Sequence, residues 1–157
     1  MATKKLTPAE PGAETPRRAL VIGYGNELRG DDAVGPQVAR RIDDLHLPGV
    51  AVVVRQQLLP ELADDIAQAD MIIFVDAERT RKVRTREVFP GSDAQVIAHS
   101  NTPEAMLWLT RSVFGRAPRA WLVTIPALHL GFRQSLSATT RRAAAQAVKE
   151  IAGLLSR

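Results

Sequence analysis

The sequence contains no cysteine. This absence excludes a disulfide framework, a thiolate zinc site and a cysteine nucleophile. Chemistry based on a serine, a carboxylate, a histidine or a metal ion is still open. The chain has 157 residues, of which 45% are hydrophobic and 24% are charged. It is therefore long enough for one domain with a real hydrophobic core.

Aromatic residues are also scarce, at 4% of the chain. Lysine and arginine outnumber aspartate and glutamate by 21 to 17, which gives a formal charge of only +4. The basic residues are scattered, and no stripe of them is interleaved with aromatics as in nucleic-acid-binding faces. We therefore expect a solvated basic surface and no nucleic-acid partner.

Long hydrophobic runs are absent as well. No stretch approaches the roughly 18 apolar residues of a membrane span. The first sixteen residues contain Pro8, Pro11 and Pro16 but no apolar segment of the kind that marks a secretory signal. These observations predict a cytoplasmic protein without membrane contact, a disordered tail over residues 1–17 and one domain over residues 18–157.

Apolar strand patterns alternate with helix patterns along the rest of the chain. Strands are predicted at residues 19–23, 50–55, 71–75, 82–89 and 121–125, and helices at residues 36–45, 59–69, 103–114 and 136–155. Thr102 or Asn101 is expected to cap the third helix, and Ser137 the last one. This alternation predicts an α/β fold, a three-layer α/β/α sandwich around a mostly parallel sheet.

The loop after the first strand, residues 23–35, is rich in glycine and acidic residues. Open α/β sheets bind ligands outside the carboxyl ends of their strands, so this loop is a candidate site. Its first glycines resemble a dinucleotide fingerprint, but Leu28 stands at the third glycine position. Asp31 and Asp32 would also repel a pyrophosphate. The loop therefore favours a cation over a nucleotide.

Two further polar residues occupy comparable places. Asp76 directly follows the apolar third strand, and His99 precedes the helix after the fourth strand. Carboxylates combined with an imidazole suit borderline divalent ions such as nickel, cobalt or zinc. Taken singly, each residue has a structural explanation: Asp31 or Asp32 caps a helix, Asp76 binds backbone amides, and His99 is an ordinary loop histidine. Their joint placement on one rim of the sheet favours a metal site.

Residues 21–35, VIGYGNELRGDDAVG, resemble the opening motif of the hydrogenase maturation proteases. That motif is a strand, then G-x-G-N-x-L-x-G-D-[DE]-G-x-G, then a helix. Residues 74–77, FVDA, resemble the second motif of the family, and His99 lies where the family carries a histidine. The likeness spans roughly residues 19–151. It implies a twisted sheet of about five strands between helices, and an endopeptidase that removes the C-terminal extension of a nickel-loaded [NiFe]-hydrogenase large-subunit precursor.

The resemblance also implies roles for individual residues. Asp32, Asp76 and His99 are expected to contact the metal and to be needed for catalysis, and the neighbouring Asp31 is included among the catalytic candidates. The metal is nickel carried by the precursor, so no tightly held resident metal is expected in the protein's own site. The protein is expected to be a monomer. One departure is Ala33, which stands where the family usually has glycine. A positive φ at this position would strain the loop and disturb Asp32.

The expected mechanism is attack by water. An acyl-enzyme would need a serine or threonine activated by a base, but Ser100 and His99 are adjacent and would point to opposite faces of an extended segment. The chain also lacks a G-x-S-x-G elbow. The nucleophile is then a metal-bound water, or a water activated by Asp31 or Asp76. The competing functions are a general metallohydrolase with its own metal and a non-proteolytic factor that checks nickel in a partner.

Overall fold

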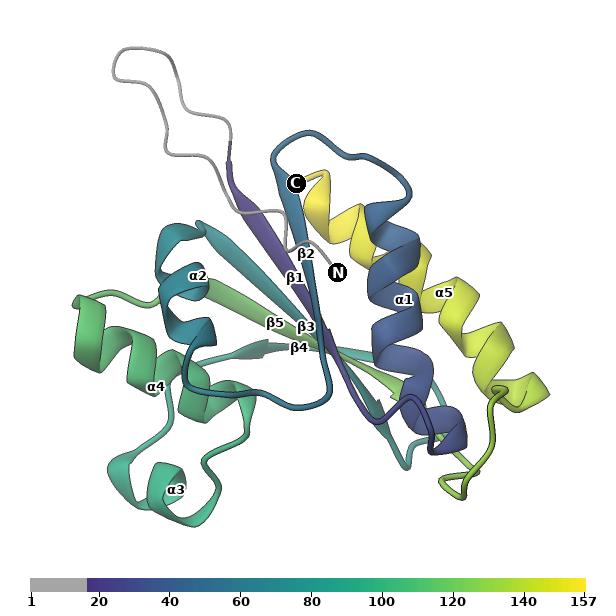
Figure 1. The fold of residues 1–157 in the computed structure, drawn as a ribbon. Helices are drawn as coiled ribbons and strands as arrows, with labels where there is room; N and C mark the ends of the chain where they lie inside the picture. Colours follow the sequence, from purple (N-terminus) through teal and green to yellow (C-terminus); the bar gives the residue numbers. More distant parts are fainter. Residues whose placement is uncertain (1–16) are drawn as a thin grey trace.

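The computed structural model describes residues 17–157, so the predicted N-terminal tail lies almost wholly outside the described residues. Within them, strands and helices alternate along the chain (Figure 1). The strands are β1 (Ala19–Tyr24), β2 (Val50–Arg55), β3 (Met71–Glu78), β4 (Arg84–Val88) and β5 (Arg119–Pro126). The helices are η1 (Gly30–Ala33), α1 (Val34–Asp43), α2 (Leu62–Gln68), α3 (Asp93–Ala98), α4 (Pro103–Phe114) and α5 (Ala138–Leu155).

The five described strands form one sheet in the order β2-β1-β3-β5-β4. β1 pairs in parallel with β2 and β3, and β3 pairs in parallel with β5, whereas β4 runs antiparallel to β5. The predicted mostly parallel sheet is confirmed. Because the chain continues from β1 to β2 on one side and from β3 toward β5 and β4 on the other, the winding reverses between β1 and β3. Such a reversal opens a ligand crevice at the carboxyl ends of the two strands.

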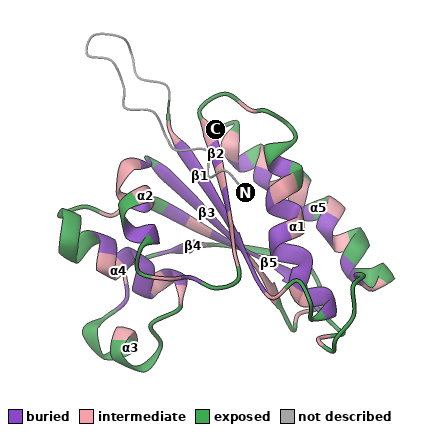
Figure 2. Cartoon of the chain, viewed as in Figure 1, coloured by how far each residue is buried: buried purple, intermediate pink, exposed green. Residues whose placement is uncertain are grey.

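Helices cover both faces of the sheet, which confirms the predicted three-layer sandwich (Figure 1). α1 and α5 share one core cluster with the sheet, and α2 and α4 share the other. Figure 2 shows β1 and most of β3 buried, which is why both are continuous apolar runs in the sequence. Fully buried side chains such as Ile73 and Phe74 each stabilise the fold by about 1.5–3 kcal/mol. Among residues 17–157, no helix is both long and apolar enough to cross a bilayer.

The sequence prediction missed two short helices, η1 and α3. α3 buries none of its side chains, so it lacks the apolar periodicity that identifies longer helices. Its one signal is a capping box, in which the Ser92 hydroxyl accepts the Gln95 amide and the Gln95 side chain accepts the Ser92 amide. The predicted caps of the longer helices are confirmed, because the Thr102 and Ser137 side chains each accept a backbone amide three residues later.

α1 approaches the ends of β1 and β3 closely because Gly35 has no side chain. A Cβ atom at this position would lie 2.5 Å from the carbonyl oxygen of Tyr24 and 2.7 Å from that of Val75. Both oxygens belong to the backbone, so the helix itself would have to move to admit a methyl group. The glycine thus allows the start of α1, and the acidic loop before it, to sit directly on the carboxyl ends of the two strands.

We expect Gly35→Ala to destabilise the protein by about 1–3 kcal/mol, because it overpacks this contact. The matched control is Gly153→Ala in α5, where an added methyl group meets no atom within 4 Å. That change should stabilise the protein by about 0.5–1 kcal/mol, because alanine favours a helix over glycine. Urea denaturation measures both effects. If Gly35→Ala unfolds at the same urea concentration as the parent, α1 is not held against the strands at this point.

Candidate metal-docking site

Asp32 is held by the loop that follows β1. Its Oδ2 accepts a hydrogen bond from the backbone amide of Asn26 at 2.6 Å, and its own amide donates to the carbonyl of Arg29 at 3.1 Å. Gly25 permits this tight path because it has no side chain. Its φ is +151°, and a Cβ atom there would lie 2.0 Å from the Asp32 carbonyl oxygen. The Asp32 side chain caps neither η1 nor α1. The helix-capping explanation therefore fails for this residue, which stays partly exposed.

Ala33 adopts an ordinary helical conformation, with φ −72° and ψ −8°. Alanine is free of strain in this region, so the departure from the family glycine does not disturb Asp32. Among residues 17–157, the only residue other than glycine with a positive φ is His46, in the turn that follows α1. The loop thus keeps its shape with alanine in place.

Asp31 is fully buried and accepts four hydrogen bonds. Its Oδ2 accepts the amides of Leu128 and His129 and the hydroxyl of Ser137, each at 2.9 Å, and its Oδ1 accepts the amide of Ser137 at 2.7 Å. Burial alone would raise the pKa of this carboxyl, but the hydrogen bonds outweigh it and lower the pKa to about 2. The bonds also occupy the lone pairs that a general base would need. This geometry gives Asp31 a positioning role and gives its candidate catalytic role no support.

Asp76 lies at the carboxyl end of β3, beside the end of β1. In the parallel register Gly23 pairs with Val75, so Tyr24, the last residue of β1, lies beside Asp76, from which β3 continues along β5 to Glu78. The winding of the sheet reverses between these two strands. Asp76 is partly exposed although the five residues before it are buried. The sequence predicted a strand that stops at Val75, whereas β3 includes Asp76 and runs on to Glu78, because these residues pair with β5.

The pKa of Asp76 is raised to about 6. Burial is the main cause, and the Tyr24 hydroxyl and the Ala77 amide act against it by hydrogen bonding to the carboxylate. The negative charges of Asp32 and Glu78 raise the pKa further. The Tyr24 hydroxyl shows the reciprocal effect, since burial and the Asp76 charge both raise its pKa. Asp32 and Asp76 are therefore close enough to repel each other, and a bound cation would relieve that repulsion.

His99 is exposed at the end of α3. Its backbone amide donates to the Gln95 carbonyl at 2.9 Å, and its carbonyl accepts the Thr102 hydroxyl at 3.2 Å. Within residues 17–157, no group of three or more His, Cys, Asp or Glu side chains is arranged to hold a metal ion. The structure therefore brings Asp32 and Asp76 near each other but does not place His99 with them as a third ligand. The three-residue ligand set stays a prediction.

The sequence did not predict a role for three residues around Asp76: Tyr24, Arg86 and Glu104. Arg86 on β4 and Glu104 in the first turn of α4 form an ion pair at 2.8 Å, and the charges of both act on the Tyr24 hydroxyl. The first turn of α4 is therefore close enough to the end of β1 for its charge to act there. Tyr24 had a signal, because it directly follows an apolar run in the sequence just as Asp76 does. Arg86 and Glu104 had none, since each resembles an ordinary surface residue of its own element.

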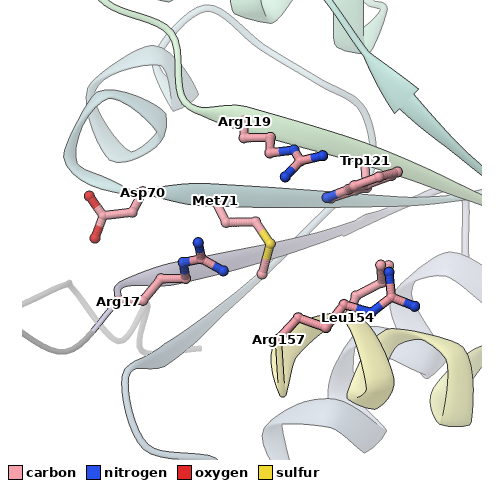
Figure 3. A pocket seen from close by; sticks show the side chains of 7 residues that line it. All are labelled: Arg17, Asp70, Met71, Arg119, Trp121, Leu154 and Arg157. Carbon is pink, nitrogen blue, oxygen red and sulfur yellow. The ribbon is translucent and has the colours of Figure 1, made fainter.

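A separate hollow of about 110 Å³ lies at the opposite end of the strands from Asp76 (Figure 3). It is lined by Arg17, Asp70, Met71, Arg119, Trp121, Leu154 and Arg157. Met71 and Arg119 are the first residues of β3 and β5, so the hollow is at the amino ends of these strands, away from Asp76. Its charges are partly engaged already, because Asp70 accepts the Arg18 amide and Arg119 pairs with Glu87. This hollow is no part of the carboxyl-edge site.

No protein-family model and no curated protein matches the chain. Solved structures do match it. Hydrogenase maturating endopeptidase HybD from E. coli superposes with a TM-score of 0.69 and 21% identity, over 88% of this chain and 92% of that one. The [NiFe] hydrogenase maturation protease HycI from Thermococcus kodakarensis KOD1 gives 0.68 and 24%, over 89% and 93%. The chain has the fold of the hydrogenase maturation endopeptidases.

A third similar structure is an uncharacterized protein from Wolinella succinogenes, with a TM-score of 0.62 and 22% identity. The match covers 88% of this chain and 96% of the Wolinella chain. In all three cases the match runs over nearly the whole length of both chains. The fold that the sequence motif implied, a twisted sheet of five strands between helices, is confirmed.

Proposed function

We propose that this protein is an endopeptidase that removes the C-terminal extension of a nickel-loaded [NiFe]-hydrogenase large-subunit precursor. The observation that carries the proposal is the approach of Asp32 and Asp76 to each other at the crevice between β1 and β3. Both residues stand at the positions that the family motifs name. The shared fold adds support, since HybD and HycI are described as a hydrogenase maturating endopeptidase and a hydrogenase maturation protease.

In this proposal nickel arrives as part of the substrate, and the two carboxylates dock it. Nickel is a borderline ion that accepts carboxylate oxygens together with imidazole nitrogen. Asp32 has one oxygen engaged by the Asn26 amide, and its Oδ1 accepts no hydrogen bond within residues 17–157. A divalent ion between Asp32 and Asp76 would replace their repulsion with attraction to a shared charge. Docking therefore selects a precursor that already holds its metal.

His99 completes the ligand set if the α3 segment shifts when the precursor binds. α3 buries none of its side chains and is tied to α4 by a hydrogen bond from the Trp108 indole to Asp93 at 2.7 Å. An element with so few buried contacts moves at low cost in free energy. We infer that the precursor draws His99 toward the nickel, which couples substrate recognition to completion of the site.

Cleavage then proceeds by hydrolysis beside the docked nickel. Water adds to the carbonyl carbon of the scissile peptide, the carbon–nitrogen bond breaks, and the amine leaves with a proton. Either nickel activates the water directly, or Asp76 accepts its proton. Asp31 is a poor base for this step, because its pKa is about 2 and its oxygens accept four hydrogen bonds. We infer that Asp31 acts instead by holding the loop that carries Asp32.

The decisive experiment is mass spectrometry of a [NiFe]-hydrogenase large-subunit precursor incubated with this protein, in nickel-loaded and nickel-free forms. We expect loss of a C-terminal peptide from the loaded form, and cleavage at least about tenfold slower for the nickel-free form, because docking needs the metal. Equal cleavage of both forms would contradict metal-dependent recognition.

The same experiment separates the competing functions. Metal-dependent association without any change in mass would indicate a non-proteolytic nickel-checking factor. A tightly held metal after purification, with hydrolysis of small peptides, would indicate a general metallohydrolase. The cytoplasmic location, the monomeric state and the lack of a nucleic-acid partner stay predictions from the sequence.

A further inference from the structure

A groove bordered by basic side chains begins where β3 ends. Its volume is about 520 Å³. It is lined by Arg79, Thr80, Arg81, Lys82, Arg84, Ala127 and Leu128. The connection from β3 to β4 forms one wall and the segment after β5 forms the other. The two walls are joined by a hydrogen bond from the Ala127 amide to the Glu78 carbonyl at 3.0 Å.

The four cations of this groove, Arg79, Arg81, Lys82 and Arg84, are all exposed. None of them forms an ion pair within residues 17–157, whereas four other arginines, on β1, α1, β4 and β5 or beside them, each pair with a carboxylate. The formal charge of the whole chain is +4, so these four residues hold as many positive charges as the entire surplus. Such a cluster repels itself and contributes no intramolecular pairing, but it attracts an anionic partner.

Each of the two walls of the groove is connected to the candidate metal-docking site. Arg79 follows β3 only three residues after Asp76. On the other wall, the Leu128 amide donates to Asp31 at 2.9 Å, while the Leu128 side chain is 53% exposed. A chain that presents its nickel to the crevice would therefore pass close to the groove. The groove offers that chain four positive charges and one apolar contact.

We propose that the groove binds an acidic stretch of the precursor polypeptide next to the peptide bond that is cleaved. This inference rests on the proposed function. Arginine presents a planar fork of donors that matches a carboxylate with two hydrogen bonds, and three of the four cations are arginines. A single-stranded nucleic acid is the less suitable occupant, because its binding grooves stack bases on aromatic side chains. No aromatic residue lines this groove.

The test uses fluorescence anisotropy with a labelled peptide of eight glutamates, and the matching peptide of eight glutamines, at low salt. The groove variant combines four neutralising substitutions: Arg79→Gln, Arg81→Gln, Lys82→Gln and Arg84→Gln. The control variant removes the same charge from exposed residues on other faces: Arg41→Gln, Arg111→Gln, Arg142→Gln and Lys149→Gln. Circular dichroism checks that both variants are folded.

We expect the parent to bind the glutamate peptide and not the glutamine peptide. The groove variant should bind at least about tenfold more weakly and the control variant within about twofold of the parent, because only the groove variant loses the local charges. Equal losses in the two variants would overturn the proposal, since general charge attraction would then explain binding. Tighter binding of an RNA octamer than of the glutamate peptide, lost in the groove variant, would overturn it in favour of nucleic acid.

Processing of the nickel-loaded precursor separates this inference from the proposed function. The groove variant should raise KM about tenfold and leave kcat within about twofold, because the groove binds the chain and takes no part in the chemistry. An unchanged KM with normal cleavage would overturn the groove proposal and leave the proposed function standing. Binding of the glutamate peptide through the groove, without cleavage of any precursor by the parent, would contradict the proposed function alone.

Discussion

Asp76→Asn is expected to abolish precursor processing while the protein stays folded. Asparagine keeps the shape of the side chain but removes the negative charge that docks nickel in the proposed complex, so cleavage should fall by about a thousandfold or more, or ~4 kcal/mol of barrier. Burial already raises the pKa of Asp76, which means that its charged form is disfavoured in the folded protein. The neutral variant should therefore be at least as stable as the parent. Cleavage assays and thermal unfolding of the same preparation measure the two effects.

The matched control is Asp64→Asn on α2, which removes an exposed aspartate that forms no ion pair within residues 17–157. It should process the precursor at the rate of the parent. Asp32→Asn should lose activity as Asp76→Asn does, because both carboxylates contact the same ion in the proposed complex. Normal cleavage by either of these two variants would remove that residue from the site.

Asp31→Asn is expected to cause the largest loss of stability among the site variants. The low pKa of Asp31 corresponds to about 2 kcal/mol of stabilisation at neutral pH. The NH₂ group of asparagine would also point toward N–H and O–H groups that now donate hydrogen bonds to the carboxylate. We therefore expect a total loss of about 3 kcal/mol in unfolding free energy and a Tm lower by roughly 10 °C. Assayed well below that Tm, the variant should keep more activity than Asp76→Asn, because Asp31 positions Asp32 and contacts no substrate.

The pH dependence of this loss has a definite sign. Because the folded-state pKa of Asp31 lies below its unfolded value, ionised Asp31 stabilises the folded protein above the unfolded pKa, near pH 4. That stabilisation is lost as the pH falls through about 2. The difference in unfolding free energy between the parent and Asp31→Asn should thus be constant from pH 7 to pH 5 and shrink below pH 4. A difference that stays constant down to pH 2 would show that the charge of Asp31 is not responsible.

The sheet and its layers were predictable because each central strand is a continuous apolar run. β1 and β3 are buried on both faces, and that burial appears in the sequence as Ala19 to Ile22 and Met71 to Val75 without a polar interruption. The same logic placed Asp76 at a strand end. α3 was not predictable, because a helix that buries nothing leaves no apolar period in the sequence.

The site was only partly predictable, for a different physical reason. Asp31 and Asp32 are adjacent in the sequence, yet one is fully buried and the other partly exposed. What separates them is the set of donors on Leu128, His129 and Ser137, which no local pattern around the aspartates can reveal. Contacts between residues this far apart depend on the tertiary fold, and so does the placement of His99.

The hydrogen bonds to Asp31 determine when the acidic loop becomes fixed during synthesis of the chain. Their donors follow the acceptor by 97 to 106 residues along the chain. During synthesis, β1 and the acidic loop emerge early, but Asp31 gains these hydrogen bonds only when β5, the segment after it and the start of α5 have been made and have folded onto the sheet. A partly synthesised chain therefore lacks the hydrogen bonds that tie Asp31, and with it the acidic loop, to the C-terminal part of the fold.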